Sequence, residues 1–478
     1  MPAAISTFLK KPVIHCTAVI FLCFLLTSTG YLSWTYHLAG QVPAGTLEVM
    51  TMVAGYLLQA LGIGVFSAII RLHPNAAARL FYAALPIHMI LMVPAVLSSY
   101  LAGTLAFGFL MNTACGFIAG YYLHILACTV SEQHRASSFG TGYGLAILVT
   151  WLLSLIRDGS VYHTAQILLI FCAVLTAVSF GVVYQEARTA DLETPEKTPV
   201  KTPVKDPENI PQAQSSSSNE PGRNLPVREN TLILVFFLVF LFSLVNSSSF
   251  SFPYSDIGNT VSVELSRLVY AAGLMIAGFV TDRNRKYGAI SALTALVIPF
   301  IMLALQGEPV SAPVFWALSY FTSGFYSVCR IILFSDLASG HALFFLSGAG
   351  LMIGRIGDAL GEGISLSMKD HLLALVALTA LLFVATVLVF FRVYHDLYIP
   401  EPARPQSEQE RFEHFAVQHD LSLREREVLR LIFDQKTNAE IAGALNISQN
   451  TVKFHVRNLM QKTGCKNRKE LFAEYLQS

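Results

Sequence analysis

The sequence predicts an all-α protein in which a polytopic membrane helix bundle carries a small helical domain at its C-terminal end. Two observations lead to this prediction. Of the 478 residues, 54% are hydrophobic and only 13% are charged, which is too apolar for an ordinary soluble protein. Residues 421–478 depart from this composition, because charged side chains there alternate with apolar positions at the spacing of amphipathic helices.

Twelve apolar segments are each long enough to cross a bilayer as a helix, and they fall into two sets of six. The first set, within residues 1–184, lies near 14–38, 47–70, 78–97, 104–128, 138–156 and 163–184. The second set, within residues 231–394, lies near 232–252, 262–280, 289–305, 313–334, 342–368 and 372–393. The lipid bilayer is therefore the first expected partner.

Two polar stretches connect these parts. Residues 185–230 contain KTPVKTPVK, further prolines and a run of serines, a composition that cannot bury enough apolar surface to fold. We expect a disordered linker there. Residues 395–420 are expected to tether the last span to the C-terminal domain, residues 421–478, with a candidate short helix near 411–419.

Lysine and arginine residues are distributed unevenly between the two sides of the predicted bundle. Most of those in short loops fall on one side, among them Lys10, Arg71 and Arg135, whereas only Arg157 and Lys369 lie on the other. The positive-inside rule then places both termini, the linker and the C-terminal domain in the cytoplasm. We expect a multi-pass protein of the cytoplasmic membrane.

Local signals in the C-terminal domain predict a helix, a tight turn and a second helix, followed by a third. Ser422 with Glu425, and Thr437 with Glu440, have the spacing of capping boxes, and Ser448 can cap the third helix. Apolar positions follow each cap at helical spacing. The third helix directs its remaining side chains outward as one face, and its basic and amide groups suit the phosphates and base edges of a major groove.

Double-stranded DNA is therefore an expected partner. The candidate DNA-binding residues lie at the starts of the second and third helices and along the outward face of the third: Thr437, Asn438, Ser448, Gln449, Asn450, Thr451, Lys453, Phe454, His455, Arg457 and Lys462. The alternative is a helical bundle that only packs or binds protein. The excess of basic residues after Asn446 favours nucleic acid.

These residues resemble the LuxR-type helix-turn-helix, in REREVLRLI, TNAEIAGALNIS and TVKFHV and in the later Gly464 and Arg468. Many positions agree in register, which makes the resemblance specific, although it covers only the C-terminal domain. The resemblance implies a transcriptional regulator. Gln435 stands where the family usually has glycine, so we expect the first helix to end without its favoured left-handed residue, at a small cost in stability.

Two six-span halves joined by a long loop resemble the major facilitator superfamily. GFVTDRNRK, at residues 278–286, resembles the superfamily's cytoplasmic GxxxDRxGRR loop without its inner glycine, and RLHPNAAAR in the first half lacks the pattern. The resemblance implies that Asp282 and a nearby cation such as Arg330 hold the inner face closed.

The combination predicts a membrane-bound one-component transcriptional regulator, whose spans sense a small molecule and control DNA binding by the C-terminal domain. The alternative is an active transporter that carries a regulatory DNA-binding tail. A proton-coupled transporter usually needs a carboxylate inside a span, and the first six spans have none well inside one, which favours the sensor. We expect no enzymatic activity or cofactor, and no metal site, since the seven cysteines form no CxxC pair.

Charged residues within the second set of spans are costly in lipid and predict a ligand pocket there. The candidate ligand-binding residues are Arg267, Glu264, Arg355, Asp358, Glu362, Tyr270, Trp316 and Tyr320. In one interpretation, Glu264 pairs with Arg267 and Arg355 pairs with Asp358 as internal salt bridges. In the other, one arginine keeps no acidic partner, which favours an anionic ligand. An alternative location for the pocket is in the first half, among Trp34, Tyr36 and Gln59.

We expect the C-terminal domain to bind DNA as a homodimer, because one short helix contacts few bases and paired half-sites supply the missing affinity. The last helix offers an apolar face for pairing, formed by Leu471, Phe472, Tyr475 and Leu476. The alternative is that this face closes the core of its own domain.

Overall fold

The structure is a computed structural model, which describes residues 11–155, 165–193, 229–250, 263–298, 300–301, 312–340, 342–399 and 408–477. The chain divides into two compact units, Met1–Tyr398 and Ile399–Ser478, which we call the membrane unit and the tail unit. The elements found in the described residues are all helices, and the chain is all-α as predicted.

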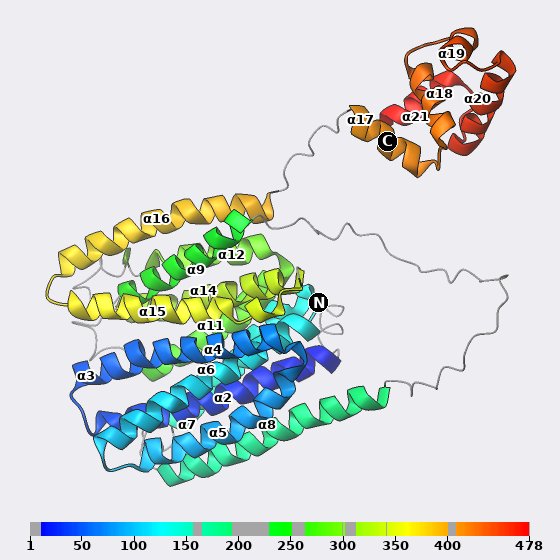
Figure 1. Cartoon of the computed structure of the whole chain (residues 1–478). Coiled ribbons are helices and arrows are strands. Elements are labelled where there is room, and N and C mark those ends of the chain that lie inside the picture. The colour runs from blue at the N-terminus through cyan, green and yellow to red at the C-terminus, as the bar shows by residue number, and fades with distance from the viewer. Residues whose placement is uncertain are drawn as a thin grey trace. The chain divides into compact units, whose positions relative to one another are not determined.

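The first half of the membrane unit is blue to cyan in Figure 1. Because lipid offers the backbone no hydrogen bonds, segments this apolar satisfy their own peptide groups as helices. The elements are α2 (Lys11–Ala39), a continuous run of α3 (Ala44–Glu48), η1 (Val49–Ala54) and α4 (Gly55–Leu72), then η2 (Pro74–Ala76), α5 (Ala77–Leu97), α6 (Leu101–Thr129), α7 (Glu132–Ser154) and α8 (Ala165–Glu193). Helix α8 thus extends into the predicted linker, of which residues 194–228 lie outside the described part.

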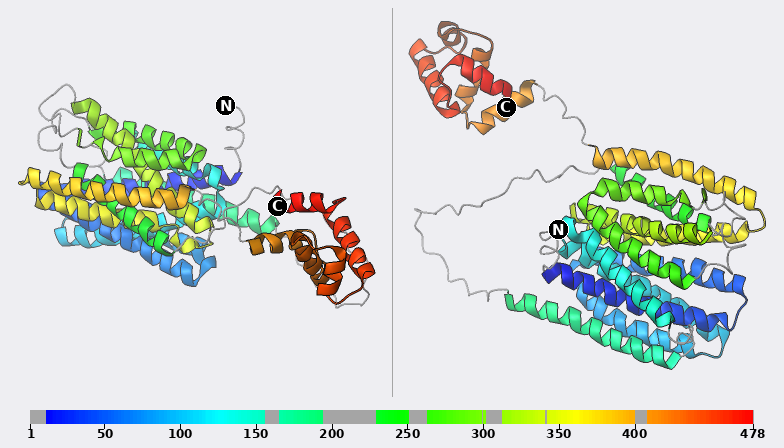
Figure 2. Two further views of the ribbon diagram at one scale, coloured as in Figure 1. Left: turned by 90° about the horizontal axis from the view of Figure 1, so that it is seen from above. Right: turned by 180° about the vertical axis from the view of Figure 1, so that it is seen from behind.

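The second half is green to yellow in Figure 1. Its elements are α9 (Glu229–Phe250), α11 (Val263–Arg283), α12 (Arg285–Ala295), α14 (Ala312–Gly340), η4 (Phe344–Leu346), α15 (Ala349–Ser367) and α16 (Leu372–Tyr398). Both views of Figure 2 show the helices of the membrane unit running side by side. The start of α2 and the ends of α8 and α16 lie at the same end of this bundle, which we call its terminal end.

Nine helices in the described residues are long and apolar enough to cross a membrane. The remaining three of the twelve predicted spans coincide with α11, α12 and α15. Helix α15 carries Arg355, Asp358 and Glu362 within 19 residues, and the regular part of α12 has only 11 residues. Charges inside such helices require partners within the protein, because lipid supplies none.

The two halves meet most extensively where α7 packs against α11. Gly140 and Gly144 of α7 lie directly against the α11 backbone, and Gly278 of α11 lies against the α7 backbone at Ala136. A side chain at any of these glycines would collide with the opposing main chain, because only small residues let two helix backbones approach this closely. This contact sets the spacing between α7 and α11, which both line the cavity described below.

The tail unit contains five helices in residues 408–477: α17 (Glu408–Gln418), α18 (Leu423–Phe433), α19 (Asn438–Ala444), α20 (Gln449–Thr463) and α21 (Arg468–Gln477). Helix α17 lies in the stretch predicted to be a tether, yet its Phe412 and Phe415 join the core of the tail unit. Phe415 is fully buried there, and its ring contacts that of Tyr475 on α21. The tail unit therefore has a hydrophobic core of its own.

Both predicted capping boxes are confirmed. The amide of Glu425 donates to the Ser422 hydroxyl at 3.4 Å, and the Glu425 carboxylate accepts from the Ser422 amide at 2.8 Å. Thr437 and Glu440 make the same pair of bonds, at 3.3 and 2.8 Å. The Ser448 side chain caps the start of α20. These local bonds fix where the three helices of the predicted motif begin.

A left-handed residue ends each of these three helices, and after α19 it is Asn446, with φ 52°. Gly464, with φ 72°, ends α20 as predicted. The expectation that α18 ends without such a residue is wrong, since Gln435 itself adopts φ 58°. The amide of Lys436 then donates to the Leu431 carbonyl at 3.0 Å, which completes a Schellman ending. The helix ends as it would with glycine, but the Cβ of Gln435 makes this conformation less favourable.

Replacing Gln435 with glycine should therefore stabilise the isolated tail unit. We expect its free energy of unfolding to rise by about 0.5–1 kcal/mol, because glycine removes the Cβ strain at positive φ. Urea denaturation of residues 399–478 measures this change. The matched control is Gln461→Gly in the exposed body of α20, where glycine should cost about 1 kcal/mol. A Gln435→Gly variant less stable than the parent would contradict the assignment of strain.

Candidate ligand cavity and DNA-binding face

A cavity of about 270 Å³ lies between the two halves of the membrane unit. Helices α2, α4, α6 and α7 of the first half and α11, α14 and α15 of the second half provide its wall. Its aromatic and polar lining includes Tyr31, Tyr56, Gln59, Tyr122, Tyr143, Arg267, Tyr270, Ser327, Arg330 and Arg355. The cavity is therefore not confined to the second half, where the sequence located the pocket, and much of its wall comes from the first.

Arg267, Tyr270 and Arg355, three of the predicted ligand-binding residues, line this cavity. Trp316 and Tyr320 lie on α14 outside the lining, with their ring centroids 5.5 Å apart. The Tyr320 ring also lies 6.4 Å from that of Tyr270. These two aromatic residues support the wall of the cavity without facing it.

Asp358 and Glu362, the predicted acidic residues whose side chains are described, do not line the cavity. Asp358 is buried on α15, and Glu362 is half-buried one turn further along that helix. The side chain of Glu264 lies outside the described part, so its pairing with Arg267 stays a prediction. The cavity wall is therefore basic and aromatic, with no aspartate or glutamate among its described residues.

Asp358 forms a buried ion pair with Arg330 of α14. Arg330 Nη1 lies 3.0 Å from Asp358 Oδ2 and donates to the Tyr326 hydroxyl at 2.7 Å. The Tyr326 hydroxyl donates in turn to Asp358 Oδ1 at 3.3 Å and lies 2.6 Å from Ser243 Oγ of α9. Within the described residues Asp358 thus pairs across helices with Arg330, and not with Arg355 on its own helix as one interpretation proposed. Neither Tyr326 nor Ser243 was among the predicted site residues, and the two lie 83 positions apart in the chain.

Arg355 has a different environment. Its guanidinium carbon lies 4.3 Å from the centroid of the Tyr56 ring on α4, which is a cation–π contact between the two halves. Its Nε is buried and has no hydrogen-bond partner among the described residues, which also place no carboxylate within ion-pair distance of it. Arg355 therefore lines the cavity with no described carboxylate within ion-pair distance, although Asp358 on the same helix is near enough to act on its charge.

Tyrosine hydroxyl groups connect the halves across the cavity. Tyr270 of α11 donates to the Tyr143 hydroxyl of α7 at 3.3 Å and lies 2.8 Å from Ser327 Oγ of α14. Of these, only Tyr270 was among the predicted site residues. A tyrosine within an otherwise apolar span is the signal that could have indicated Tyr143 and Tyr56.

A charged cluster joins the halves where α7 begins and α11 ends. Asp282 accepts hydrogen bonds from the amides of Ala136 and Ser137 at 2.8 and 2.7 Å, as an anion at a helix N-terminus does. Arg285 lies 2.9 Å from Asp282 and 2.8 Å from Asp336 of α14. Arg135 also pairs with Asp336, at 2.6 Å. We call these four residues, Arg135, Asp282, Arg285 and Asp336, the latch cluster.

The contacts of the latch cluster agree with one expectation about Asp282 and differ from another. Asp282 bridges the halves as the resemblance implied, but its cation is Arg285 and not Arg330, which is committed to Asp358. The cluster lies toward the terminal end of the bundle, because Ser138 of α7 contacts Thr17 near the start of α2 at 2.9 Å. A second contact between the halves joins the end of α4 to η4, where the Arg71 guanidinium carbon lies 5.3 Å from the centroid of the Phe345 ring.

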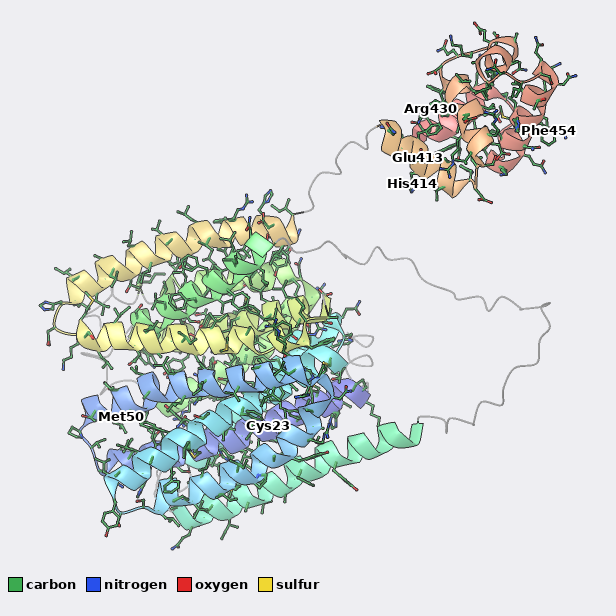
Figure 3. All side chains as sticks on the ribbon, viewed as in Figure 1. Cys23, Met50, Glu413, His414, Arg430 and Phe454 are labelled. Atoms are coloured by element: carbon green, nitrogen blue, oxygen red, sulfur yellow. The ribbon has the colours of Figure 1, made fainter. Side chains whose placement is uncertain are left out.

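The predicted recognition face of α20 is exposed. Gln449, Asn450, Lys453 and Arg457 are exposed, and Phe454, which Figure 3 labels on this helix, has 51% of its surface exposed. His455 and Thr451 are half-buried on the same helix. The opposite side of α20 buries Val452 and Leu459 in the core. The helix therefore presents a basic and amide-bearing face to solvent.

Other predicted DNA-binding residues also hold the domain together. The hydroxyls of Thr437 and Ser448 are helix caps, and the side-chain oxygen of Asn438 accepts from Arg468 at 2.7 Å. The Lys462 ammonium lies 2.8 Å from the Glu425 carboxylate, which is buried. These residues have structural partners in the absence of DNA.

The Glu425 carboxylate joins two parts of the motif. Burial alone would raise its pKa, but the hydrogen bonds from Lys462 and from the Ser422 amide outweigh burial and hold the pKa below its usual value. The carboxylate therefore stays ionised and ties the end of α20 to the start of α18. This bond holds α20 against the start of α18.

The apolar face of α21 mostly closes the core of its own domain. Leu471 is fully buried and Tyr475 is 5% exposed, and the Tyr475 ring lies 4.4 Å from that of Phe433. Phe472 remains 46% exposed, and the side chain of Leu476 lies outside the described part. Only part of the face predicted to pair is therefore available for a second copy.

Residues 419–474 match the family model described as bacterial regulatory proteins, luxR family. Over 56 residues the chain is 48% identical to the spore germination protein GerE of Bacillus subtilis (strain 168), a match that covers 12% of this chain and 76% of GerE. The chain belongs to the luxR family of bacterial regulatory proteins. It is also 44% identical over 52 residues to the regulatory protein SdiA of Escherichia coli (strain K12), but that match spans only 22% of SdiA. The luxR-family likeness is confined to the tail unit.

The membrane unit has a different structural relative. The human organic anion transporter MFSD10 (TETRAN) superposes with a TM-score of 0.57 at 14% sequence identity, over 80% of this chain and 100% of that one. This likeness shows the fold alone. The luxR-family protein therefore joins a membrane unit of the major facilitator fold to its helix-turn-helix.

Proposed function

We propose that this protein is a membrane-bound one-component transcriptional regulator. Its membrane unit binds a small molecule in the cavity between the halves, and the occupied state changes DNA binding by the tail unit. The observation that carries the proposal is that one chain holds both a luxR-family domain with an exposed recognition face and a membrane unit with an internal cavity. Sensor and DNA reader are thus covalently joined.

The proposal places the terminal end of the bundle in the cytoplasm. The start of α2 and the ends of α8 and α16 lie at this one end, and the positive-inside rule assigns the same side to the cytoplasm. A tail unit that follows α16 then reaches DNA. A ligand acts only if it binds two arrangements of the membrane unit with different affinity, since equal affinity shifts no equilibrium.

Lys453 and Arg457 should carry phosphate contacts of the tail unit. We expect Lys453→Ala and Arg457→Ala each to weaken binding and to reduce the slope of log affinity against log salt by about 0.9, because each removes one neutralised phosphate. Fluorescence anisotropy of the isolated tail unit on a duplex selected from a random pool, at about 50 to 200 mM salt, measures both effects.

The matched control for this experiment is Arg424→Ala. Arg424 is an exposed arginine on α18, away from α20, and it pairs with Glu427. Its replacement should leave the salt slope unchanged. Wild-type affinity and slope in both α20 variants would show that α20 does not face the phosphates.

A footprint covering one unpaired half-site at full affinity would refute the proposed homodimer.

The second candidate function is transport by a protein that also carries a regulatory tail. The major facilitator fold and the internal cavity favour it. Against it, no aspartate or glutamate lies among the described lining residues, and proton-coupled transporters usually place such a group on the pathway. Transport is tested by the uptake of labelled benzoate, a small organic anion, into vesicles that contain the chain truncated before residue 399. Concentrative uptake would refute a membrane unit that only senses.

A further inference from the structure

The cavity contains an excess of positive charge, because three arginines line it: Arg267, Arg330 and Arg355. Arg267 has an interaction of its own, and among the described residues Asp358 is the carboxylate within ion-pair distance of Arg330. Asp358 is committed to Arg330, through an ion pair at 3.0 Å and the shared Tyr326 hydroxyl. Arg355 is left with the face of Tyr56.

Tyr56 contacts Arg355 through its ring face and through its hydroxyl, but one hydroxyl leaves most of the guanidinium donors unused. A guanidinium has five N–H donors arranged as a planar fork, which matches two oxygens of one carboxylate. Its Nε has no acceptor among the described residues, although it is buried. An arginine buried in a membrane span with unused donors costs free energy unless an anion or water accepts its hydrogen bonds.

The size and lining of the cavity restrict that anion. A volume of about 270 Å³ lies at the lower end of the range of about 300–1,000 Å³ that is usual for ligand pockets, so the ligand is small. Tyr31, Tyr56, Tyr122 and Tyr143 line the first-half side of the same space. Aromatic walls favour a planar apolar body over a hydrated sugar or phosphate.

We propose that the cavity binds a small organic carboxylate, which Arg355 holds through its guanidinium fork while an aromatic or other apolar body lies among the cavity tyrosines. The consequence for transcription rests on the proposed function, but the binding itself does not. Because Tyr56 is on α4 and Arg355 on α15, an anion here contacts both halves at the residue pair that joins them. The same anion therefore has the means to favour one arrangement of the halves.

The test uses benzoate as the probe and benzamide as a neutral molecule of the same shape. Purified full-length protein in detergent micelles is heated with each compound at constant ionic strength, and the midpoint of unfolding is recorded. Benzoate should raise the midpoint in a saturable manner, whereas benzamide should not. No benzoate-dependent rise in the wild-type protein would overturn the proposal.

Arg355→Gln should lose the benzoate shift while remaining folded, because its removal leaves no described carboxylate without a partner. The matched control is Arg79→Gln, an exposed arginine of α5 outside the cavity, which should keep the full shift. A benzoate shift of wild-type size in Arg355→Gln would overturn the proposal. If that variant does not fold, Arg355→Lys decides the matter: it keeps the charge but loses the fork, so benzoate should bind about tenfold more weakly. Unchanged affinity in Arg355→Lys would refute the role of Arg355.

A transcriptional readout separates this inference from the proposed function. A reporter driven by a promoter selected with the tail unit is measured with and without benzoate. A benzoate shift that Arg355→Gln abolishes, with no change in the reporter, supports the anion site and refutes sensing of this anion. A reporter that responds equally in wild-type protein and Arg355→Gln supports sensing and refutes the site.

Discussion

Replacing Arg330 with glutamine should lower the free energy of unfolding of the membrane unit by about 3–5 kcal/mol, the usual cost of removing one partner of a buried ion pair. Arg330 and Asp358 are each only 7% exposed, and their charged atoms lie 3.0 Å apart. The variant leaves the Asp358 carboxylate with the Tyr326 hydroxyl, at 3.3 Å, as its described partner. Denaturant titration of the purified protein in mixed micelles measures the loss.

The double variant Arg330→Gln, Asp358→Asn should recover most of this loss, because the two charges disappear together and the amides can bond to each other. Arg79→Gln, at an exposed site, should change stability by less than about 0.5 kcal/mol. An Arg330→Gln variant as stable as the parent would show that the ion pair is not structural. The most informative comparison is with the stability of Arg355→Gln, because that change removes a buried arginine and leaves no described anion unpaired.

The tail unit was predictable from the sequence because its signals are local. A capping box needs only two residues three positions apart, and Ser422 with Glu425 fulfils it whatever the rest of the chain does. Gln435 shows the limit of such reasoning. The absence of glycine indicated a missing left-handed residue, but the bond from Lys436 to Leu431 is enough to hold glutamine in that conformation.

The ion pairs of the membrane unit were not predictable from the sequence. Helical spacing indicates only partners on the same helix, whereas helix packing brings in partners from elsewhere in the chain. Arg355 and Asp358 are three apart on α15, which suggested a pair. Arg330, which is 28 positions away, takes Asp358 instead, because Tyr326 orients both groups. The same limit applies to Asp282, whose amide partners are Ala136 and Ser137 of the other half.

The latch cluster should hold the halves together at the terminal end of the bundle, and removing Asp282 should release them. Asp282→Ala leaves the amides of Ala136 and Ser137 without their acceptor and removes one of the two carboxylates that Arg285 contacts. Hydrogen bonds to a charged group are worth about 1.5–3 kcal/mol each. Losing even one of them corresponds to about tenfold to a hundredfold, so the population of the separated arrangement should rise by at least about tenfold.

The rate of maleimide labelling at a cysteine in the closed contact measures this population. Ser137→Cys is a nearly isosteric site that is only 2% exposed, and the background replaces Cys128, Cys329 and Cys465, which are not buried, with serine. Labelling should accelerate by at least about tenfold in Asp282→Ala, in proportion to the separated population. Arg285→Gln is the second variant, since it breaks the bonds to Asp282 and Asp336 without enlarging the space beside Ser137. Faster labelling in both variants means that the halves part, whereas faster labelling in Asp282→Ala alone means that a local hole has formed. Wild-type rates in both would show that glycine packing between α7 and α11 holds the halves together without the latch cluster.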